Sequence, residues 1–331
     1  MNKQILLKSR PIGKPTISNF EIVESPTIEV KEGEIVVKAC YISVDPYMRG
    51  RMSDAKSYIA PFEVGKPIDG GVIAEVIESK HPNFQVGDAV LASLQWKEIQ
   101  VVAADKVTKL DKMIAPVSYY LGLLGMPGLT AYFGLQDIGK PIAGETVVVS
   151  GAAGAVGLAV GQIAKIQGCR VIGITGSDDK VKLLVEKYGF DEAINYKTTT
   201  YMSNAIGTVC TDGVDIYFDN VGGDISDAVI NNLNFQARVA ICGQISLYNS
   251  NTVSVGPRIQ PMLLSKSAMM RGFLINNFKS EFPDAMQYLT RWLDEGKLKY
   301  TETTFRGFDQ LTDAFLGLFN GENVGKMIVK M

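Results

Sequence analysis

Histidine is almost absent from this chain of 331 residues, which contains only His81. Its four cysteines, Cys40, Cys169, Cys210 and Cys242, are scattered and never show a CxxC spacing. A catalytic zinc site needs about three Cys, His or carboxylate ligands around an open position, and a structural site needs paired cysteines. The sequence therefore predicts no metal site. It predicts His81 in a surface turn and the cysteines as buried thiols in a reducing cytoplasm.

Long apolar runs and an excess of one charge are also missing. No apolar span of about 18 residues occurs. The first ten residues, MNKQILLKSR, include too few apolar residues for a signal peptide. Basic residues number 33 against 35 acidic ones, without a basic run or a basic-aromatic stripe. These absences argue against a membrane span and a nucleic-acid partner, and we expect a cytoplasmic protein.

The chain is organised around residues 146–168, TVVVSGAAGAVGLAVGQIAKIQG. The apolar run at 147–149 is typical of a strand buried on both faces. Gly151, Gly154 and Gly157 follow in a turn, and apolar residues then recur at helical spacing. Glycines allow a pyrophosphate to approach the backbone, and a helix N-terminus offers free N–H groups. A tight packing turn would use the same residues, but a second apolar strand at 170–175 completes a βαβ unit and favours a dinucleotide site.

The hydrophobic content of 46% is enough for a large core, and the pattern divides into two domains. Short apolar runs punctuated by Gly and Pro fill the first third, and strands alternate with helices after about residue 126. The last thirty or so residues supply two strands and a helix that we assign to the first domain. We therefore predict an α/β protein with a β-rich domain at 1–122 and 297–331 and a doubly wound, Rossmann-type parallel sheet at 123–296.

Particular elements follow from the same patterns. Strands are expected at 34–42, 70–78, 88–93, 147–149, 170–175, 192–195, 214–219, 238–242 and 269–275. A helix capped by Ser177 is expected to bury Val181, Leu184, Val185 and Tyr188. Another helix is expected around 284–293.

Six motifs appear in order along the chain: SVDPYMRGRMS (43–53), LGMPGLTAYFGL (124–135), AAGAVG (152–157), YFDNVGG (217–223), ICGQISLYN (241–249) and NVGKMIVK (323–330). Together they resemble the zinc-independent medium-chain dehydrogenase/reductases, in the group of the prostaglandin reductases (leukotriene B4 dehydrogenases) and the NADPH-dependent curcumin reductases. The resemblance covers essentially the whole chain. It implies a GroES-like catalytic domain, a homodimer, and NADPH-dependent reduction of the carbon–carbon double bond of small α,β-unsaturated ketones and aldehydes.

The end of the 170–175 strand bears on the choice of nicotinamide. NAD sites place an acid there for the ribose 2′-hydroxyl, whereas a 2′-phosphate needs a cation. No acid stands at this strand end; Asp178 and Asp179 come just after it, as first-turn residues would, and Lys180 follows. The resemblance assigns Lys180 and Tyr196 to the 2′-phosphate, although Lys180 alone would pass for a solvated helix residue. NADPH is the expected cofactor.

The resemblance also implies further cofactor contacts. They fall on Gly154, Ala155, Val156, Gly157, Asn220, Cys242, Gly243, Tyr248, Phe273, Leu274, Ile275 and Asn323. Two of these have simpler alternatives, because Asn220 could end a strand in a turn and Asn323 could cap a loop.

Conjugate reduction develops negative charge on the carbonyl oxygen, which needs a hydrogen-bond donor, and the α-carbon then needs a proton. Tyrosine hydroxyls or the nicotinamide ribose are the natural donors in a chain without a useful histidine. The resemblance implies three candidates, Tyr47, Tyr248 and Tyr58, which stand where the family lines its cleft; Tyr58 could equally be a surface aromatic. Ser265 stands where several relatives carry a tyrosine, which puts in doubt any mechanism that depends on that hydroxyl.

Three points stay open. Arg49 and Arg51 could steer an acidic substrate or pair with nearby carboxylates, and pairing is favoured. A quinone reductase of the same superfamily would share the fold and the glycine turn. A non-catalytic NADPH sensor would keep the cofactor site without the chemistry.

Overall fold

The computed structural model describes residues 2–26 and 29–331 and forms two compact units. The first comprises Met1–Leu121 and Glu302–Met331, and the second Gly122–Thr301. Residues 297–301, which the sequence assigns to the first domain, belong to the second unit. The reason is visible in Gln162, whose side chain bonds both the N–H (2.7 Å) and the carbonyl oxygen (3.0 Å) of Lys299. The tail therefore leaves the second unit only at the strand β14 (Glu302–Arg306).

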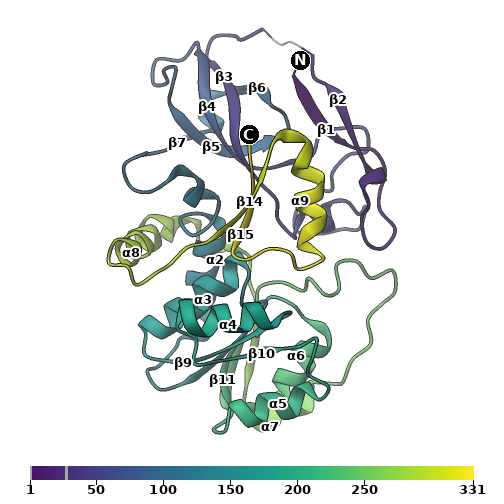
Figure 1. The fold of residues 1–331 in the computed structure, drawn as a ribbon, viewed down its shortest axis with the longest axis vertical. Coiled ribbons are helices and arrows are strands. Elements are labelled where there is room, and N and C mark those ends of the chain that lie inside the picture. The colour runs from purple at the N-terminus through teal and green to yellow at the C-terminus, as the bar shows by residue number, and fades with distance from the viewer. Residues whose placement is uncertain (1, 27–28) are drawn as a thin grey trace. The chain divides into compact units, whose positions relative to one another are not determined.

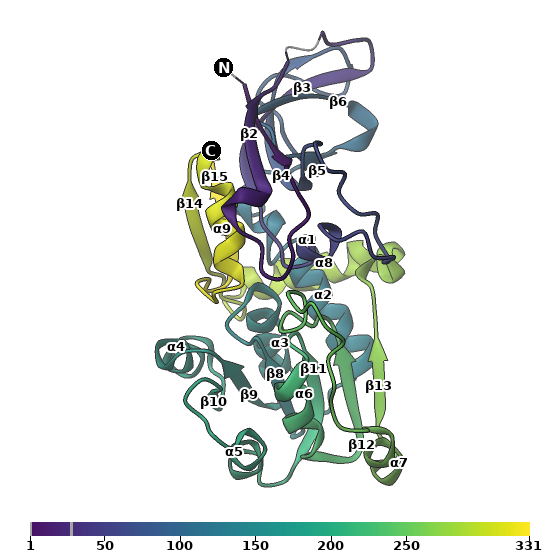
Figure 2. The same ribbon diagram turned by 90° about the vertical axis from the view of Figure 1, so that its right-hand side faces the viewer.

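The second unit contains a six-stranded parallel sheet in the order β10-β9-β8-β11-β12-β13 (Figure 2). Its strands are β8 (Thr146–Ser150), β9 (Arg170–Thr175), β10 (Glu192–Asn195), β11 (Val214–Asp219), β12 (Leu233–Ile241) and β13 (Met269–Gly272). The expected strands are all present, and the Rossmann-type sheet is confirmed. The last strand ends three residues earlier than expected, because the ring of Phe273 packs at 6.2 Å against Phe218 and a 3₁₀ helix (Ile275–Glu281) begins soon after.

Helices cover both faces of this sheet. They are α2 (Met126–Phe133), α3 (Ala155–Ile166), α4 (Asp178–Tyr188), α5 (Met202–Val209), α6 (Gly223–Ile230), α7 (Gln260–Lys266) and α8 (Phe282–Asp294). The helix α3 packs against α2 and α4, whereas α5 packs against α6. Figure 1 accordingly shows α3 and α4 together and α5, α6 and α7 gathered apart from them. Right-handed crossovers place successive helices on a face in this way.

The helix α4 shows how local sequence sets these elements. Ser177 caps it by accepting a hydrogen bond from the Lys180 N–H at 3.3 Å, and Gly189 ends it with a φ of 72°. Leu184 and Tyr188, four residues apart, are buried on one face. The expectation that Val185 shares this face is wrong, because one step of about 100° turns its side chain outward, where it is 38% exposed.

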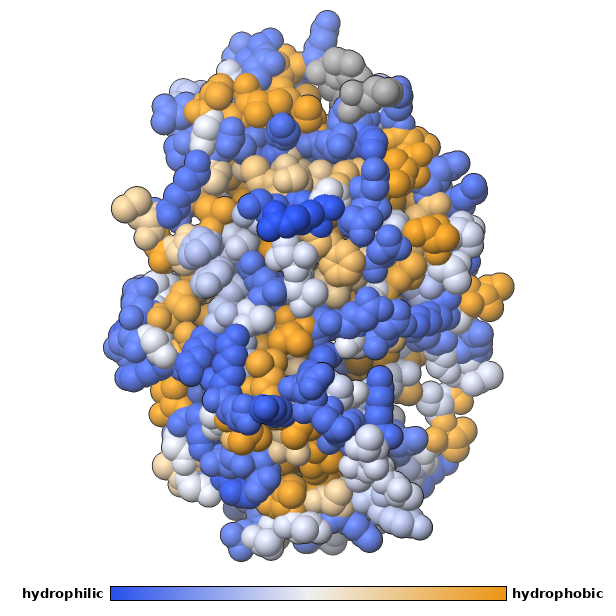
Figure 3. All heavy atoms as spheres, in the orientation of Figure 1, coloured by the Kyte–Doolittle hydropathy of each residue, from blue (hydrophilic) through white to orange (hydrophobic). Residues whose placement is uncertain are grey.

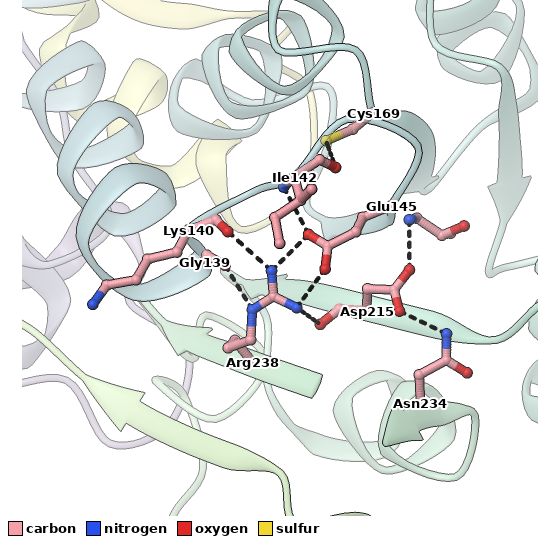
Figure 4. Close-up of polar contacts among 9 residues, drawn as sticks. Gly139, Lys140, Ile142, Glu145, Cys169, Asp215, Asn234 and Arg238 are labelled. Atoms are coloured by element: carbon pink, nitrogen blue, oxygen red, sulfur yellow. Dashed lines mark hydrogen bonds and ion pairs between the residues drawn. The ribbon is translucent and has the colours of Figure 1, made fainter. Parts of the chain in front are cut away.

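A polar cluster fixes the amino ends of the central strands (Figure 4). The guanidinium of Arg238 on β12 makes two hydrogen bonds, 2.8 and 2.6 Å, to the carboxylate of Glu145 just before β8. Asp215 on β11 accepts from the Thr146 N–H at 2.8 Å and from the amide of Asn234 at 2.7 Å. These bonds join β8, β11 and β12 at the edge opposite the glycine turn.

The first unit is a mixed sheet in the order β14-β15-β3-β4-β5-β7, with β6 paired to β3. Its strands are β1 (Lys3–Leu7), β2 (Phe20–Glu24), β3 (Glu34–Ser43), β4 (Asp69–Ser79), β5 (Ala89–Gln95), β6 (Ile99–Ala103), β7 (Thr108–Lys109), β14 (Glu302–Arg306) and β15 (Lys326–Lys330). The strands β1 and β2 form a separate antiparallel pair. Two helices, α1 (Met48–Arg51) and α9 (Leu311–Leu318), complete this β-rich unit.

One core joins distant parts of the first unit. The ring of Phe315 on α9 lies 6.0 Å from that of Phe20 and 6.3 Å from that of Trp96, both edge to face. The strand β15 pairs with β3 in an antiparallel register that sets Val329 opposite Ile42. Figure 2 shows α9 beside β14 and β15. The carboxyl-terminal segment is therefore part of the core and the sheet of the first unit.

The four cysteines are all free, but only Cys169 and Cys210 are buried. The expectation of four buried thiols is wrong for Cys40 and Cys242, which are half-buried. In the case of Cys40, a register irregularity between Ala39 and Tyr41 breaks the alternation of β3. Burial raises the pKa of Cys169 and Cys210 to about 11. Cys242 is half-buried as a whole residue, but desolvation of its thiol, and next the charge of Asp219, raise its pKa to about 12. All three stay protonated at neutral pH and are poor nucleophiles.

Hydrophilic and hydrophobic residues are interspersed on the face drawn in Figure 3. Within residues 2–26 and 29–331, no helix combines the length and the apolar character that crossing a bilayer requires.

Candidate functional site

The glycine turn between β8 and α3 forms a backbone cradle. Gly151 has a φ of 60°, a left-handed conformation that a side chain would strain. The first intrahelical bond runs from the Leu158 N–H to the Gly154 carbonyl at 3.0 Å, so the N–H groups of residues 155–157 precede the helical ladder. A Cβ atom on Gly157 would lie 2.4 Å from the Gly151 oxygen. Gly157 therefore lets the helix close onto the strand, and the cradle offers free donors to an anion.

This cradle lies where the strand order reverses. The chain proceeds from β8 to β9 and β10 on one side and to β11, β12 and β13 on the other. A Cβ atom on Gly151 would lie 3.4 Å from the side chains of Asn220 and Val221, which follow β11. The turns after β8 and β11 thus meet at the carboxyl edge, and ligands of open α/β sheets bind at such a switch point.

Asp219, the last residue of β11, organises this edge. Its side chain is buried, and Oδ1 accepts hydrogen bonds from Ser150 Oγ (2.9 Å), the Tyr217 hydroxyl (2.8 Å) and the N–H groups of Val221 and Gly222 (3.0 and 2.9 Å). Its carbonyl oxygen accepts from the N–H groups of Cys242 and Gly243 at 2.8 and 3.1 Å. One residue therefore fixes both turns that follow β11 and β12. Asp219 was not among the predicted site residues, although an acid at the end of an apolar strand was a usable signal.

Asn220 links the two central strands. Its amide donates to the Ser150 carbonyl at 2.8 Å, and its N–H donates to Ser150 Oγ at 2.9 Å. Asn220 therefore does end β11 in a turn and stabilise that turn, as the simpler alternative to a cofactor contact expected. A contact between Asn220 and the cofactor stays a prediction. The two bonds to Ser150 fix the position of Asn220 at the carboxyl edge of the sheet.

Tyr248 also lies at the carboxyl edge of the parallel sheet. Its hydroxyl accepts a hydrogen bond from the Gln244 N–H at 3.3 Å. A Cβ atom on Gly243 would lie 3.3 Å both from that hydroxyl and from the Asn220 carbonyl oxygen. The structure thus brings three predicted site residues together: Tyr248, Gly243 and Asn220. The neighbouring predicted segment is less uniform, because Leu274 is exposed while the ring of Phe273 contacts Phe218 and Phe278.

The residues predicted to bind the 2′-phosphate of NADPH lie at the carboxyl ends of β9 and β10. The ring of Tyr196 covers Gly176, since a Cβ atom there would lie 3.0 Å from its Cε1 atom. Burial, and next the positive charge of Lys197, lower the pKa of Lys180. The positive charge of Lys197 is therefore near enough to be felt by Lys180, and two cations in this part of the unit would suit a doubly charged phosphate. Lys197, which directly follows Tyr196 in the NYK motif, was not among the predicted site residues.

Three predicted residues belong to the first unit. Tyr47 precedes α1 and is half-buried against the core, and burial and the negative charge of Asp45 raise the pKa of its hydroxyl well above the usual range. Tyr58 is 65% exposed, as a surface aromatic would be. The amide of Asn323 donates to the Gly325 carbonyl at 3.0 Å, as expected of a residue that caps a loop.

The two arginines have structural partners. Both Nη atoms of Arg51 bond the carboxylate of Asp69, one of them at 2.9 Å, and its guanidinium lies 3.9 Å from the centre of the Phe62 ring. Arg49 is buried and donates to the Gly13 carbonyl at 2.8 Å. Structural pairing thus accounts for Arg51, and Arg49 bonds a backbone carbonyl. On α7, the hydroxyl of Ser265 is exposed and bonds the Met262 carbonyl at 3.1 Å, as in an ordinary helix turn.

The comparisons agree with this architecture. Residues 3–110 match the family described as the N-terminal domain of oxidoreductase, and residues 155–291 match the one described as zinc-binding dehydrogenase. A 2-alkenal reductase (NADP(+)-dependent) of Nicotiana tabacum is 43% identical over 99% of this chain and 97% of its own. The NADPH-dependent curcumin reductase of Escherichia coli is 38% identical over 100% and 97%. This chain is a zinc-independent medium-chain dehydrogenase/reductase.

One more relative and two solved structures are also similar to this reductase. A relative in Bacillus subtilis, named as an NADP-dependent oxidoreductase, is 52% identical over 99% of this chain and 97% of its own. Among solved structures, CurA of Vibrio vulnificus in complex with NADPH is 42% identical over 99% of each chain, with a TM-score of 0.95. An Escherichia coli quinone oxidoreductase complexed with NADPH shares the fold, with 20% identity, 99% and 100% coverage and a TM-score of 0.77.

One matching family is described as zinc-binding, so we looked for zinc ligands in this reductase. Among the described residues, no group of three or more His, Cys, Asp or Glu side chains could hold a metal ion. His81 accepts a hydrogen bond at Nδ1 from the Asn83 N–H, 3.2 Å away, within its own turn. The described donor set therefore does not fit zinc.

Proposed function

We propose that this reductase uses NADPH to reduce the carbon–carbon double bond of α,β-unsaturated aldehydes and ketones. The observation that carries the proposal is the similarity, over nearly the full chain, to reductases named for such activity. The residues at the carboxyl edge support the cofactor: the cradle of residues 154–157 suits a pyrophosphate, and Lys180 with Tyr196 and Lys197 suits a 2′-phosphate.

The bound cofactor supplies a hydride to the β-carbon of the substrate. Charge then develops on the carbonyl oxygen, and a hydroxyl donor lowers the barrier. Tyr47 is the first candidate because its hydroxyl is protonated in the physiological range and can donate a hydrogen bond, while its raised pKa makes it a weak acid. Tyr248 is the second candidate, since it lies beside Gly243 and Asn220. Tyr58 is the third.

Two rival functions, a quinone reductase and a non-catalytic NADPH sensor, can be separated from the proposed one by a single experiment. A quinone reductase shares the fold at 20% identity, which supports the fold alone. A sensor would bind NADPH without turnover. NADPH oxidation measured against 2-alkenals, enones and quinones, with identification of the products, separates the three. We expect saturated aldehydes and ketones from the first two classes; turnover of quinones alone, or of none, would contradict the proposal.

We further propose that the reductase is a homodimer in the cytoplasm. The proposal of a homodimer rests on the motif resemblance. The proposal of a cytoplasmic location is supported by the four cysteines, which are all free, as a reducing compartment favours. Sedimentation velocity of the purified protein tests the dimer, and a monomer across micromolar concentrations would contradict it.

A further inference from the structure

Asn195, the last residue of β10, uses both ends of its side chain. It is 9% exposed. Its Nδ2 atom donates to Oδ1 of Asp178 at 2.7 Å, and its Oδ1 atom accepts from the Lys197 N–H at 3.1 Å. A buried amide with both groups engaged holds its partners in fixed positions. Those partners are residues of opposite charge, one at the start of α4 and one just after β10.

Asp178 is the first carboxylate after β9 and the first residue of α4. In NAD-binding chains a carboxylate in this region accepts the ribose 2′-hydroxyl, whereas the same charge repels a 2′-phosphate. Here the hydrogen bond from Asn195 occupies Asp178 and directs it toward β10. The carboxylate keeps its charge and its second oxygen, but its orientation is set by the protein through Oδ1.

Lys197 is the other partner. Its side chain is exposed, but its backbone is fixed by Asn195, and its charge reaches Lys180. Between them the ring of Tyr196 rests on Gly176. The same amide therefore restrains a carboxylate that would repel a phosphate and fixes the backbone from which a cation that would attract one extends.

We propose that Asn195 is a positioning residue that sets the preference for NADPH over NADH, acting through Asp178 and Lys197. The proposal rests on the placement of the 2′-phosphate beside Lys180. Asn195 itself needs no contact with the cofactor.

Isothermal titration calorimetry with NADP⁺ and NAD⁺ tests the proposal without any enone. Failure of the proposed substrate class would therefore leave the result intact. In Asn195→Ala we expect NADP⁺ to bind about tenfold more weakly, the size of one charge-assisted hydrogen bond. NAD⁺ should change by less than about twofold, because it carries no phosphate at this position, and it also reports that the site is folded. Equal losses for both cofactors, or no loss for NADP⁺, would overturn the proposal.

Asp178→Asn provides the second arm. Alone it should change NADP⁺ affinity little, because the bond from Asn195 already directs the carboxylate toward β10, whereas in the Asn195→Ala background it should recover part of the lost affinity. Absence of any recovery would refute the role of Asp178. If Asn195→Ala fails to fold, Asn195→Ser keeps a small polar group and carries the same expectations.

Asn234→Ala is the matched control. Its amide bonds Asp215 at the same 2.7 Å, in the same sheet but at the amino edge. The variant loses a comparable Asn–Asp contact, so its thermal stability should fall while its preference between NADP⁺ and NAD⁺ stays unchanged. A changed preference in this control would overturn the assignment to the Asn195 site.

Discussion

The ammonium of Lys326 lies 2.9 Å from Oδ1 of Asp45, and both side chains are buried. Lys326 also donates to the carbonyl oxygens of Val44 and Met327 at 2.8 and 3.1 Å, and Asp45 is bonded by the Ser43 hydroxyl as well. This pair joins β15, near the carboxyl terminus, to the turn before α1. The same turn leads to Tyr47, and the charge of Asp45 contributes to its raised pKa.

Replacing Lys326 by Met should destabilise the first unit strongly. Removing one partner of a buried pair leaves the other charge uncompensated, which costs about 3–5 kcal/mol. Urea denaturation followed by circular dichroism measures the loss. Lys3→Met is the control, because its ion pair with Asp309 is exposed and its loss should have a far smaller effect. If Lys326→Met and Lys3→Met lower the urea midpoint equally, the buried pair is not a principal stabilising contact.

Lys180→Ala should raise the KM for NADPH and leave that for NADH nearly unchanged. A charge-assisted contact with a phosphate contributes about 1.5–3 kcal/mol, or roughly 10- to 150-fold in affinity. Steady-state kinetics with each cofactor at a fixed enal concentration measures the change. Lys182→Ala, on the same helix with its ammonium 3.9 Å from Glu186, should leave both KM values as they are. Equal losses with both cofactors in Lys180→Ala would remove Lys180 from the phosphate site.

The Rossmann-type sheet could be predicted because its signal is local. An apolar run such as 147–149 indicates a buried strand wherever it occurs, and the glycine turn and the helical spacing after it complete the unit within about thirty residues. The exposure of Val185 was not predictable to the same accuracy, since adjacent apolar residues on a helix differ only in angle.

The polar contacts that shape the site had no such signal. Lys326 and Asp45 lie 281 positions apart and look like surface charges in the sequence. Asn195 resembles a residue that ends a strand in a turn, and its two partners become evident only once β9 and β10 are adjacent. Such residues are set by tertiary contacts, so spacing and composition cannot identify them.

Activity should not depend on a metal ion. Among the described residues no cluster of three or more ligand side chains occurs, and His81 bonds within its own turn. Dialysis against a strong chelator should leave the rate of NADPH oxidation unchanged. Elemental analysis of the active protein provides the independent check, and stoichiometric zinc whose removal abolishes activity would contradict the expectation.

The pair of Glu145 and Arg238 should make stability depend on acid pH (Figure 4). Burial opposes ionisation of Glu145, but the hydrogen bonds from Arg238 and from the Ile142 N–H outweigh it and lower the pKa of the carboxyl group. A lowered pKa in the folded state means that the stabilisation is present above the ordinary value of about 4.3 and is lost as the pH falls through the folded value.

Urea midpoints between pH 7 and pH 3 measure this dependence. The difference between the unchanged protein and Glu145→Gln should be largest at neutral pH and shrink in acid. Glu186→Gln, which removes a carboxylate from an exposed pair, should show a small difference at every pH. A difference for Glu145→Gln that stays constant down to pH 3 would contradict the assignment.

Tyrosine hydroxyls should carry the proton and oxyanion chemistry, with Tyr47 or Tyr248 more important than Tyr58. Loss of one donor to an oxyanion typically lowers kcat by about 10²–10³. Tyr→Phe removes only the hydroxyl, so thermal stability should change little, and the exposed Tyr58→Phe serves as the matched control. A loss confined to kcat marks a contact made in the transition state, whereas a rise in KM alone marks substrate binding. If all three variants reduce an enone at the parent rate, the nicotinamide ribose or water delivers the proton, and positioning of the reactants accounts for the catalysis.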